Sequence, residues 1–409
     1  MTKKLSLVLI LALILGMSAQ AFAAPVEIDY WSVFTGADGA TMQGMVDSFN
    51  NSQNEVFVNH TPMTADDLYQ KIPLAVQTGS GVPDVAIVHI ERIPMFVKQE
   101  MIYPVDFLME NGIEEENYIP SAWERTDIEE EHYGVPLDVH GFVTYYNKDM
   151  FDKYDLNSFV EDGYLTFDEI PALGDKAREN GYEGKIFGLT WFRAQMLSYY
   201  AQLNGKLTED GTNPSFNNDD MKKVYQTIKD LHDSGYTTLK GDDPLQLFHS
   251  GDLLVWPEGI WMKEGVRLAG INYGMLASAC FSPDVCANWM SSHNFVQFAD
   301  EERTEEEDIA VAKFINFMGE NSLTWAVNGG QVPAHVSIND VEEFGDLHQA
   351  FLADPERGDE LAIYYYLYWG IFDTAFSRNG WEPIYGTMSI EEALNQAEQE
   401  VLDGIKALE

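Results

Sequence analysis

The order of apolar and polar positions in the first quarter of the chain predicts alternating strands and helices. Residues 27–33 are predicted as a strand, and residues 55–59 alternate as a second one. Residues 83–88 follow as a short buried strand that ends at His89. Between the first two strands, four apolar residues share one face of a predicted helix: Met42, Met45, Val46 and Phe49. This alternation favours parallel pairing in an α/β sheet.

Polar residues and glycines mark the ends of further predicted helices. Thr64, with Asp67 three residues later, is typical of a helix start, and this helix ends at the Gly-Ser-Gly of residues 79–81. Residues 221–234 predict an amphipathic helix, and residues 309–318 predict another. Internal repeats and long Pro/Ser/Gly linkers are absent from the sequence, so we expect the chain to cross between its parts several times.

The N-terminus has the pattern of a secretory signal peptide. Lys3 and Lys4 precede an apolar run over residues 5–17 and a small-residue stretch that ends at Ala24. That run is about 13 residues long, shorter than the roughly 20 that a membrane-spanning helix needs. We expect cleavage after Ala23, because a cut one residue later would place a proline beside the scissile bond. With no cysteine near the cut, no lipid anchor is indicated, and we expect a free periplasmic protein.

The length of the chain indicates the number of domains, and its charge disfavours some kinds of partner. Removing 23 of the 409 residues leaves 386, which predicts two lobes at roughly 100 to 200 residues per domain. The 24 basic residues face 67 acidic ones, a net charge of −43, which disfavours nucleic acid and anionic lipid as partners. This acidity suits either capture of cationic ligands or a hydrated surface in a salty medium. The scattered acids, in short runs such as 114–116 and 305–308, favour the second explanation.

Metal and cofactor motifs are not apparent in the sequence. Cys280 and Cys286 have a spacing that permits a disulfide in an oxidising compartment, with two free buried thiols as the alternative. The same spacing is not a recognisable zinc site. The acidic segment 210–220 lacks the spacing of a calcium-binding loop, so we interpret it as a solvated turn. We therefore expect no metal and no cofactor.

Enzyme signatures are also missing, whereas aromatic residues recur beside polar ones. The sequence contains no nucleophile elbow, zinc-protease helix, phosphate loop or dinucleotide-binding glycine pattern. Trp191, Trp256, Trp261 and Trp325 lie in polar, glycine-containing segments. Sugars need this combination, because their C–H faces stack on flat rings while their hydroxyls need planar donors and acceptors. Each tryptophan taken alone is more often a core residue.

Several segments in succession resemble a known family. These are residues 30–39, 81–86, 133–140, 145–149, 248–261 and 326–333. Their content and spacing are similar to those of extracellular solute-binding proteins of family 1, the sugar-binding components of ABC importers and relatives of maltose-binding protein. The resemblance spans nearly all of the mature chain. Residues 291–295 depart from it, since many relatives carry a glycine-rich segment there.

The resemblance implies a fold and a division of the chain. The fold is the two-lobe α/β periplasmic-binding-protein fold of type II, each lobe a sheet flanked by helices, with hinge crossings near residues 136–141, 287–293 and 333–338. The implied division is a signal peptide at 1–23, an N-terminal lobe at 24–138 and 289–335, and a C-terminal lobe at 139–288 and 336–409. The ligand is expected in the cleft between the lobes, which agrees with the preference of α/β ligands for the carboxyl ends of strands.

Mapped onto this chain, the resemblance implies candidate ligand-binding residues in both lobes. Those of the first lobe and the hinge are Thr35, Gly36, Asp38, His89, Glu91, Asp138 and His140. Those of the second lobe and the returning segment are Trp191, Arg193, Trp256, Glu258, Trp261, His293, Asn328, Gly330 and Gln331. Structural roles compete with these: Asp38 is equally suited to cap a helix, His89 to meet a carbonyl, and Arg193 to form a salt bridge. Tyr366 and Trp369 are expected on an aromatic helix, where core packing is favoured over ligand contact.

The implied function is capture without chemistry. We expect a monomer that closes two lobes around a carbohydrate, an oligosaccharide by preference, and is then recognised by the membrane permease of an ABC importer. A secreted glycoside hydrolase with Glu258 and Asp138 as its acid pair is the first alternative. The second alternative keeps the fold but binds a polyamine, a peptide or a metal complex.

The acidic composition predicts a stability that depends on salt. Raising NaCl from low to molar concentration should raise the thermal unfolding midpoint, because salt screens the repulsion among the many carboxylates. The midpoint is measured by circular dichroism across a salt series. A midpoint that stays constant or falls contradicts the idea of a surface suited to a salty medium.

Overall fold

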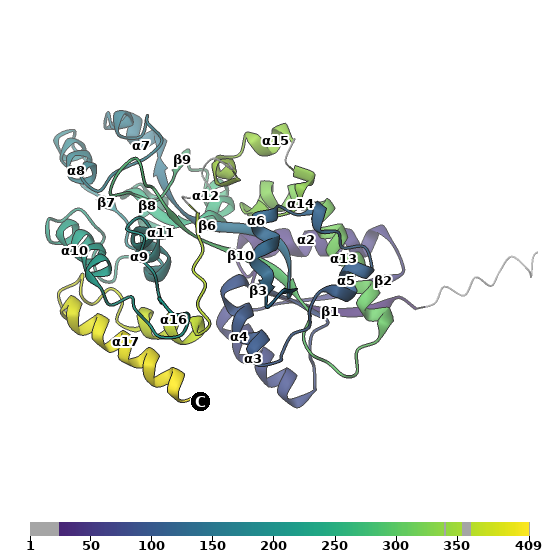
Figure 1. Ribbon diagram of the computed structural model, residues 1–409. Coiled ribbons are helices and arrows are strands. Elements are labelled where there is room, and N and C mark those ends of the chain that lie inside the picture. The colour runs from purple at the N-terminus through teal and green to yellow at the C-terminus, as the bar shows by residue number, and fades with distance from the viewer. Residues whose placement is uncertain (1–23, 339–340, 354–360, 409) are drawn as a thin grey trace, which may run out of the picture.

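The computed structural model describes residues 24–338, 341–353 and 361–408. The predicted signal peptide, residues 1–23, lies outside this part of the chain. Within it, no helix combines the length and the apolar character required to cross a bilayer. The fold is α/β, as predicted, with helices gathered into two groups along one continuous sheet (Figure 1). We call the half that contains β1 to β3 the first lobe and the half that contains β7 to β9 the second lobe.

Three parallel strands begin the sheet in the first lobe. β1 (Val26–Ser32) lies between β2 (Val56–Pro62) and β3 (Val85–His89) and pairs in parallel with both. The connecting helices are α2 (Ala37–Ser52) and α3 (Ala65–Thr78). The buried face of α2 consists of the four predicted residues, Met42, Met45, Val46 and Phe49. The apolar spacing in the sequence therefore predicted both the elements and the face that the helix buries.

The helix ends follow the polar signals in the sequence. The Thr64 side chain accepts the backbone N–H of Asp67 at the start of α3, and Gly79 ends this helix with φ 60°, a left-handed conformation that glycine adopts without strain. Thr304 and Glu307 form a capping box at the start of α13 (Glu305–Glu320). The predicted helix at 221–234 is α10 (Asp219–Asp233).

Two long strands carry the sheet from one lobe to the other. β10 (Asn288–Val296) pairs with β3 through its second half and with β6 (Val135–Asn147) along most of its length, in both cases antiparallel. Beyond Gly141, β6 pairs instead with β8 (Leu253–Gly259) and β9 (Tyr273–Leu276). The first two predicted crossings fall within these strands, which occupy the middle of Figure 1.

The third predicted crossing lies after β11 (Val332–Pro333), which pairs with β6. Ala334 is buried in the core of the first lobe, whereas Ile338 packs in a cluster of the second. Val332 belongs to the same cluster as Ile338, so this segment of the chain lies where the two lobes meet. The lobe boundaries proposed from the sequence stay a prediction.

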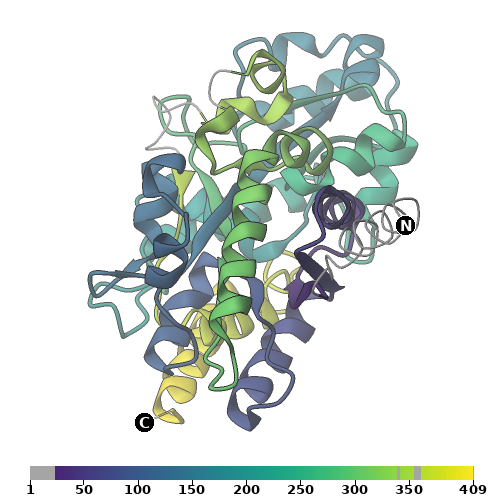
Figure 2. The ribbon, with the colours of Figure 1, turned by 90° about the vertical axis from the view of Figure 1, so that its right-hand side faces the viewer.

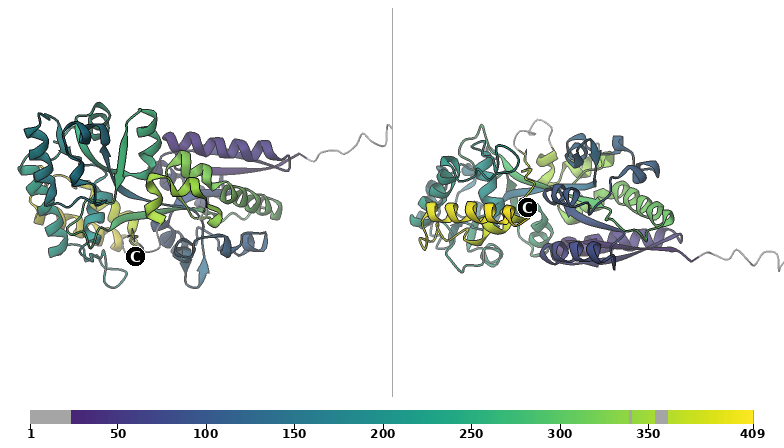
Figure 3. Two further views of the ribbon diagram at one scale, coloured as in Figure 1. Left: turned by 90° about the horizontal axis from the view of Figure 1, so that it is seen from above. Right: turned by 60° about the horizontal axis from the view of Figure 1, so that its bottom comes forward.

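Each lobe buries its own core. In the first lobe, α13 packs against β1 and α5 (Asp106–Glu110), and it runs along this lobe in Figure 2. In the second lobe, aromatic rings of α9 (Phe192–Ala201) and α16 (Trp369–Arg378) share a core with α10. α17 (Ile390–Lys406) packs on α16 and α10, on the side of this lobe that faces the viewer in the right-hand view of Figure 3.

The remaining elements are short. The strands are β4 (Asp127–Ile128), β5 (Glu131–His132), β7 (Lys185–Phe187) and β12 (Leu361–Ala362). The α-helices are α4 (Ile93–Lys98), α6 (Pro120–Trp123), α7 (Lys148–Lys153), α8 (Glu169–Glu179), α11 (Pro244–Ser250), α12 (Lys263–Leu268), α14 (Ser322–Thr324) and α15 (Glu342–Gly345). The other helical turns are η1 (Ile90–Arg92), η2 (Glu115–Asn117), η3 (Glu124–Thr126), η4 (Asn157–Phe159), η5 (Ile260–Met262), η6 (Trp325–Gly329), η7 (Val336–Ile338) and η8 (His348–Ala353), of which η6 is a π-helix.

The aromatic segment 364–369 does not form the helix expected from the sequence. Residues 363–366 have no regular structure, and helix α16 begins at Trp369. Tyr364, Tyr366 and Tyr368 nevertheless lie in the core of the second lobe. The burial of Tyr366 and Trp369 was predicted correctly, but the helical conformation of residues 364–368 was not, because tertiary packing buries the rings without a regular helix.

Cys280 and Cys286 are joined in the disulfide that their spacing permits. The bond closes a loop with a sequence separation of 6 residues. The disulfide restricts only a short loop, so it lowers the entropy of the unfolded chain by a small amount. The free energy of unfolding of the double variant Cys280→Ser/Cys286→Ser should therefore be about 2 kcal/mol lower than that of the oxidised wild type. Urea denaturation of the variant, compared with wild type under oxidising and reducing conditions, measures the difference. A variant as stable as the oxidised wild type contradicts a contribution from this bond.

Candidate functional site

A cavity of about 370 Å³ lies between the two lobes. Its first-lobe wall comes from α3, the end of β3 and η1, and its second-lobe wall from α9, α16 and the start of β10. Four of the predicted site residues line it: His89, Glu91, Trp191 and Arg193. The other residues that line it are Ala65, Asp66, Tyr69, Arg92, Phe192, Ala194, Trp289, Trp369, Asp373 and Ser377.

The ends of two parallel strands position the predicted residues. Glu91 lies in η1, two residues after the end of β3, and Trp191 lies in the loop between β7 and α9. These strands belong to different lobes, and each delivers its polar or aromatic side chain beyond its carboxyl end. The cleft position expected for α/β proteins is therefore present in this chain.

Trp191 combines exposure with an unusual backbone. Its side chain is 58% exposed, and its φ of 37° lies in the left-handed region that bulky residues avoid. Such a conformation costs on the order of 1 to 3 kcal/mol and persists where surrounding structure fixes it, often at ligand sites. An exposed indole that is held in a strained turn and lines a cavity is suited to stack on a ligand.

Two arginines share one carboxylate across the cavity. Nη1 of Arg193 lies 2.6 Å from Oδ2 of Asp373, and Nη2 of Arg92 lies 3.5 Å from the same oxygen. The Arg193 guanidinium also lies over the rings of Trp289 and Trp369, at 5.3 Å and 5.1 Å from their centroids. The salt bridge that competed with ligand binding in the sequence prediction is therefore formed, at the wall of the cavity.

Three buried polar atoms on the cavity walls have no hydrogen-bond partner among the described residues. They are Oε1 of Glu91, Nε of Arg193 and Nε1 of Trp289. The other oxygen of Glu91 accepts the hydroxyl of Ser291 at 2.7 Å, and burial raises the pKa of this carboxyl above its ordinary value. Buried polar atoms are rarely left unpaired in proteins, so an acceptor and two donors here are suited to a polar ligand.

Behind the cavity, a row of polar residues crosses the centre of the sheet. His89 on β3 lies opposite His293 on β10, and His293 lies opposite Asp138 on β6. His140 shares the face of Asp138, because side chains alternate along a strand. The Asp138 carboxylate accepts Nδ1–H of His140 at 3.1 Å and of His293 at 2.9 Å, and it also accepts the indole N–H of Trp325 at 2.7 Å.

These contacts explain the protonation of the row. Burial alone would raise the pKa of Asp138, but the neighbouring histidines, above all His293, lower it below its ordinary value. Burial lowers the pKa of both His89 and His293. We therefore describe the row as an ionised carboxylate that accepts N–H groups from two imidazoles and one indole.

Trp256 does not lie at the cavity, contrary to the sequence prediction. It is 1% exposed and packs in a core cluster against Phe248 and Tyr145. The physical reason is that every residue of β8 is buried, so this strand has no free face from which an indole can reach a ligand. Trp325 is likewise buried, where it donates to Asp138.

Other predicted residues lie beside the cavity without lining it. Trp261 is half-buried and packs edge-on against Trp191 and against His140, at centroid distances of 5.9 Å and 5.8 Å. Glu258 is buried under this group, and burial raises its pKa to about 8, an effect that hydrogen bonds from the Gly259 amide and the Trp191 side chain partly offset. These residues support the position of Trp191.

The remaining predictions fall at two loops of the first lobe. The carboxylate of Asp38 accepts the backbone N–H of Gly36 and Gly39 in the first turn of α2, so it has a structural contact, although Gly36 is the N-cap of this helix. Thr35 and Gly36 are exposed beside it. Asn328 is exposed, Gly330 packs on the Ile260 carbonyl, and Gln331 is fully buried. The structure does not bring either group to the cavity.

Among the cavity residues that the sequence analysis missed, four take part in the ring and charge contacts of its walls. Tyr69 and Arg92 lie on the first lobe, and the Arg92 guanidinium stacks over the Tyr69 ring at 4.6 Å. Trp289 and Asp373 belong to β10 and α16 of the second lobe. Trp289 carried a detectable signal, since it is a tryptophan next to a predicted hinge crossing. Tyr69, Arg92 and Asp373 occupy ordinary helical or turn positions, and only the packing of distant elements brings them together.

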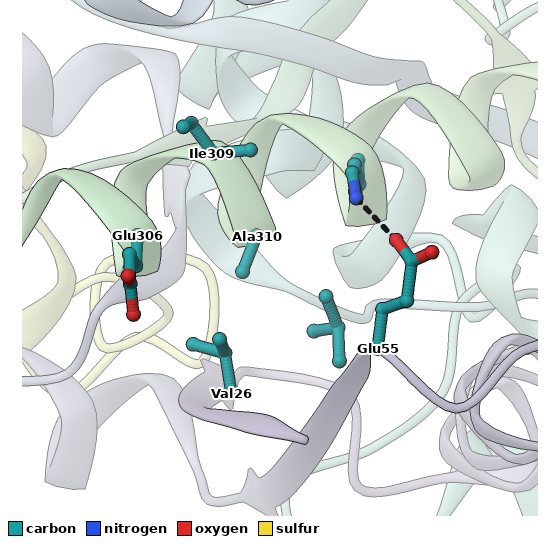
Figure 4. Close-up of a pocket in the computed structure, with 7 residues that line it drawn as sticks. Val26, Glu55, Glu306, Ile309 and Ala310 are labelled. Atoms are coloured by element: carbon teal, nitrogen blue, oxygen red, sulfur yellow. Dashed lines mark hydrogen bonds and ion pairs between the residues drawn. The ribbon is translucent and has the colours of Figure 1, made fainter. Parts of the chain in front are cut away.

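A second hollow, of about 160 Å³, lies on the outer edge of the first lobe. It is formed by the starts of β1 and β2 and by α13, and one side is bounded by the ion pair between Lys313 and Glu55 at 2.6 Å (Figure 4). Apart from this pair and Glu306, its walls are aliphatic. It lacks the aromatic rings and unpaired polar atoms of the cavity between the lobes, so we do not regard it as a ligand-binding site.

Comparisons with known proteins agree with this geometry. The family model described as bacterial extracellular solute-binding protein matches residues 44–350. The sn-glycerol-3-phosphate-binding periplasmic protein of Rhizobium meliloti is 24% identical over 340 residues, 75% of this chain and 74% of that protein. The arabinooligosaccharide-binding protein of Bacillus subtilis is 25% identical over 209 residues, 50% of this chain and 47% of that protein.

A solved structure shares the fold. The ABC substrate-binding protein from Listeria monocytogenes, in complex with cycloalternan, superposes with a TM-score of 0.80 at 18% sequence identity, covering 93% of this chain and 99% of that chain. This likeness confirms the predicted fold class, the two-lobe fold of type II.

The buried carboxyl of Glu258 predicts a stability that depends on pH. Its pKa is about 8 in the folded protein against an ordinary value of 4.5. The protonated form therefore stabilises the fold fully below pH 4.5, and this contribution is lost as the pH rises through about 8. Relative to Glu258→Gln, the free energy of unfolding of the wild type should fall across this range. Urea denaturation at several pH values measures it, with the exposed Glu179→Gln as control; a difference independent of pH contradicts the assignment.

Proposed function

The chain belongs to the bacterial extracellular solute-binding proteins, and we propose that it captures a carbohydrate between its lobes for the membrane permease of an ABC importer. The observation that carries the proposal is the composition of the cavity walls. Trp191, Trp289 and Trp369 provide flat apolar surface, and unpaired polar atoms of Glu91 and Arg193 lie among them. A sugar likewise combines apolar C–H faces with hydroxyl groups, so it can contact both the rings and the polar atoms.

The ligands named for similar proteins support this class. One relative is an arabinooligosaccharide-binding protein, and the superposed Listeria protein was solved with cycloalternan, a carbohydrate. Another relative binds sn-glycerol-3-phosphate. A phosphate group needs free cations, whereas both arginines of this cavity already contact Asp373. We therefore favour a neutral sugar over a phosphorylated one.

The two-lobe arrangement supplies a mechanism for capture. A ligand that contacts both Glu91 and Trp191 binds more tightly when the lobes approach, so it favours the closed form by the difference in contacts. The crossing strands β6 and β10 connect the lobes and limit their relative motion to bending. The permease then recognises the closed form. We further propose that the chain is exported by its signal peptide and acts as a periplasmic monomer.

Capture without turnover is the expected chemistry. The acid pair suggested for a hydrolase, Asp138 and Glu258, is buried, and neither residue lines the cavity. Asp138 is already surrounded by three N–H donors. A sugar in the cavity would therefore meet neither a free nucleophile nor a general acid from this pair.

Replacing the exposed tryptophan tests the site. Trp191→Ala should weaken the binding of the best ligand from an oligosaccharide thermal-shift screen by about 1 to 3 kcal/mol, by analogy with the loss of a base-stacking ring. Isothermal titration calorimetry measures the change. Phe57→Ala, which removes an aromatic ring of 44% exposure, is the matched control and should bind normally. Equal affinity in Trp191→Ala and wild type would remove the proposed stacking surface.

The same screen separates a receptor from an enzyme. After long incubation with each bound oligosaccharide, chromatography should recover the sugar unchanged. Appearance of shorter products contradicts the proposal. A screen in which glycerol phosphate, polyamines or peptides raise the unfolding midpoint and sugars do not would assign the cavity to another ligand class.

A further inference from the structure

Three histidines meet at the back of the cavity, on neighbouring strands of the sheet. His89 ends β3, His293 lies opposite it on β10, and His140 lies on β6. The register between β10 and β6 shifts directly after His293, an irregularity of the kind that re-aims a side chain. One ring nitrogen from each histidine lies within 4.8 Å of those of the other two.

We propose that His89, His140 and His293 together bind a divalent transition metal ion, with Zn²⁺ as the best match. Three neutral imidazoles are a set that zinc accepts in sites with an open fourth position, and imidazole suits copper and nickel as well. The proposal does not depend on the carbohydrate assigned to the cavity. It departs from the sequence expectation of no metal, because the three residues are far apart along the chain and only the strand register unites them.

The second layer around the histidines has the arrangement typical of metal ligands. Asp138 holds Nδ1 of both His140 and His293. The hydroxyl of Tyr69 lies 2.5 Å from Nδ1 of His89 and accepts the backbone N–H of the same residue. Because each Nδ1 is engaged, the proposal takes the Nε2 atoms as the metal ligands. Carboxylate or hydroxyl partners on the second nitrogen orient the imidazoles of many metal sites.

The charges of the row also favour a cation. Asp138 is 0% exposed, and its ion-pair partners among the described residues are His140 and His293, with no lysine or arginine. A buried carboxylate is costly without a compensating positive charge. A bound M²⁺ would supply a positive charge directly beside this carboxylate.

The geometry requires a modest adjustment. Zn²⁺ holds imidazole nitrogens at about 2.0 to 2.1 Å, so two nitrogens of a tetrahedral site lie about 3.3 Å apart. The rings of His140 and His293 are stacked with centroids 4.0 Å apart and must splay to converge on one ion. His89 lines the cavity, so the remaining position of the metal would face the space between the lobes.

Metal titration of the untagged, chelator-treated chain tests the proposal. Co²⁺ is the spectroscopic probe and Zn²⁺ the calorimetric one. We expect intense visible d–d absorption of a tetrahedral Co²⁺ complex at one equivalent, and its loss when Zn²⁺ is added. Absence of this absorption in a folded sample, together with no heat of Zn²⁺ binding, overturns the proposal.

Variants identify the ligands. His293→Gln and His140→Gln should abolish the Co²⁺ spectrum, and Tyr69→Phe should weaken Zn²⁺ binding by about 10- to 100-fold, the effect of losing an outer-shell partner. His132→Gln, outside the cluster, is the matched control and should bind metal like the wild type. Circular dichroism confirms folding of each variant. Metal binding that survives in His293→Gln and His140→Gln, or is lost in His132→Gln, contradicts the assignment.

A parallel measurement keeps this proposal separate from the carbohydrate function. Sugar binding is measured with EDTA present and with Zn²⁺ present. Sugar binding in EDTA without any metal binding overturns the metal site and leaves the carbohydrate function intact. Metal binding with no response to any sugar supports the metal site and overturns the carbohydrate function.

Discussion

The buried carboxylate of Asp138 is the interaction on which the centre of this structure depends. It lies on β6 at the point where the sheet passes between the lobes, and it accepts N–H groups from His140 on the same strand, His293 on β10 and Trp325 on η6. A buried anion is tolerated only where donors surround it, so the three elements must meet in one arrangement. The same requirement fixes the floor of the cavity, because β10 also positions Trp289 and Ser291, the hydroxyl partner of Glu91.

In the cavity walls, too, charged side chains hold one another in place. Asp373 holds the guanidinium groups of Arg92 and Arg193, which come from different lobes, so the ion pairs couple the two sides of the cleft. The aromatic rings beside them hold Arg193 in place through its flat face. The charged groups of Arg92, Arg193 and Asp373 therefore bind one another. The polar atoms left without a partner are those able to bind hydroxyl groups.

Local sequence signals predicted the helices and strands well, but they did not predict which side chains the fold brings together. The spacing of Met42 to Phe49 and the caps at Thr64 and Gly79 depend on neighbours within a few residues, and these predictions are confirmed. Trp191 and Trp256 have similar polar, glycine-containing surroundings in the sequence, yet one lies in a strained turn and the other in a strand buried on both faces. The row of histidines required the register of three strands, which no local pattern contains.

The overall charge of −43 bears on both proposed sites. A strongly negative protein repels anionic ligands at long range but exerts little force on a neutral sugar, so the acidity does not hinder carbohydrate capture. It raises the local concentration of cations near the surface, and divalent cations respond most strongly because the attraction scales with their charge. The negative charge of the protein is thus compatible with a neutral sugar in the cleft and a metal ion behind it, whereas it would repel a phosphorylated ligand.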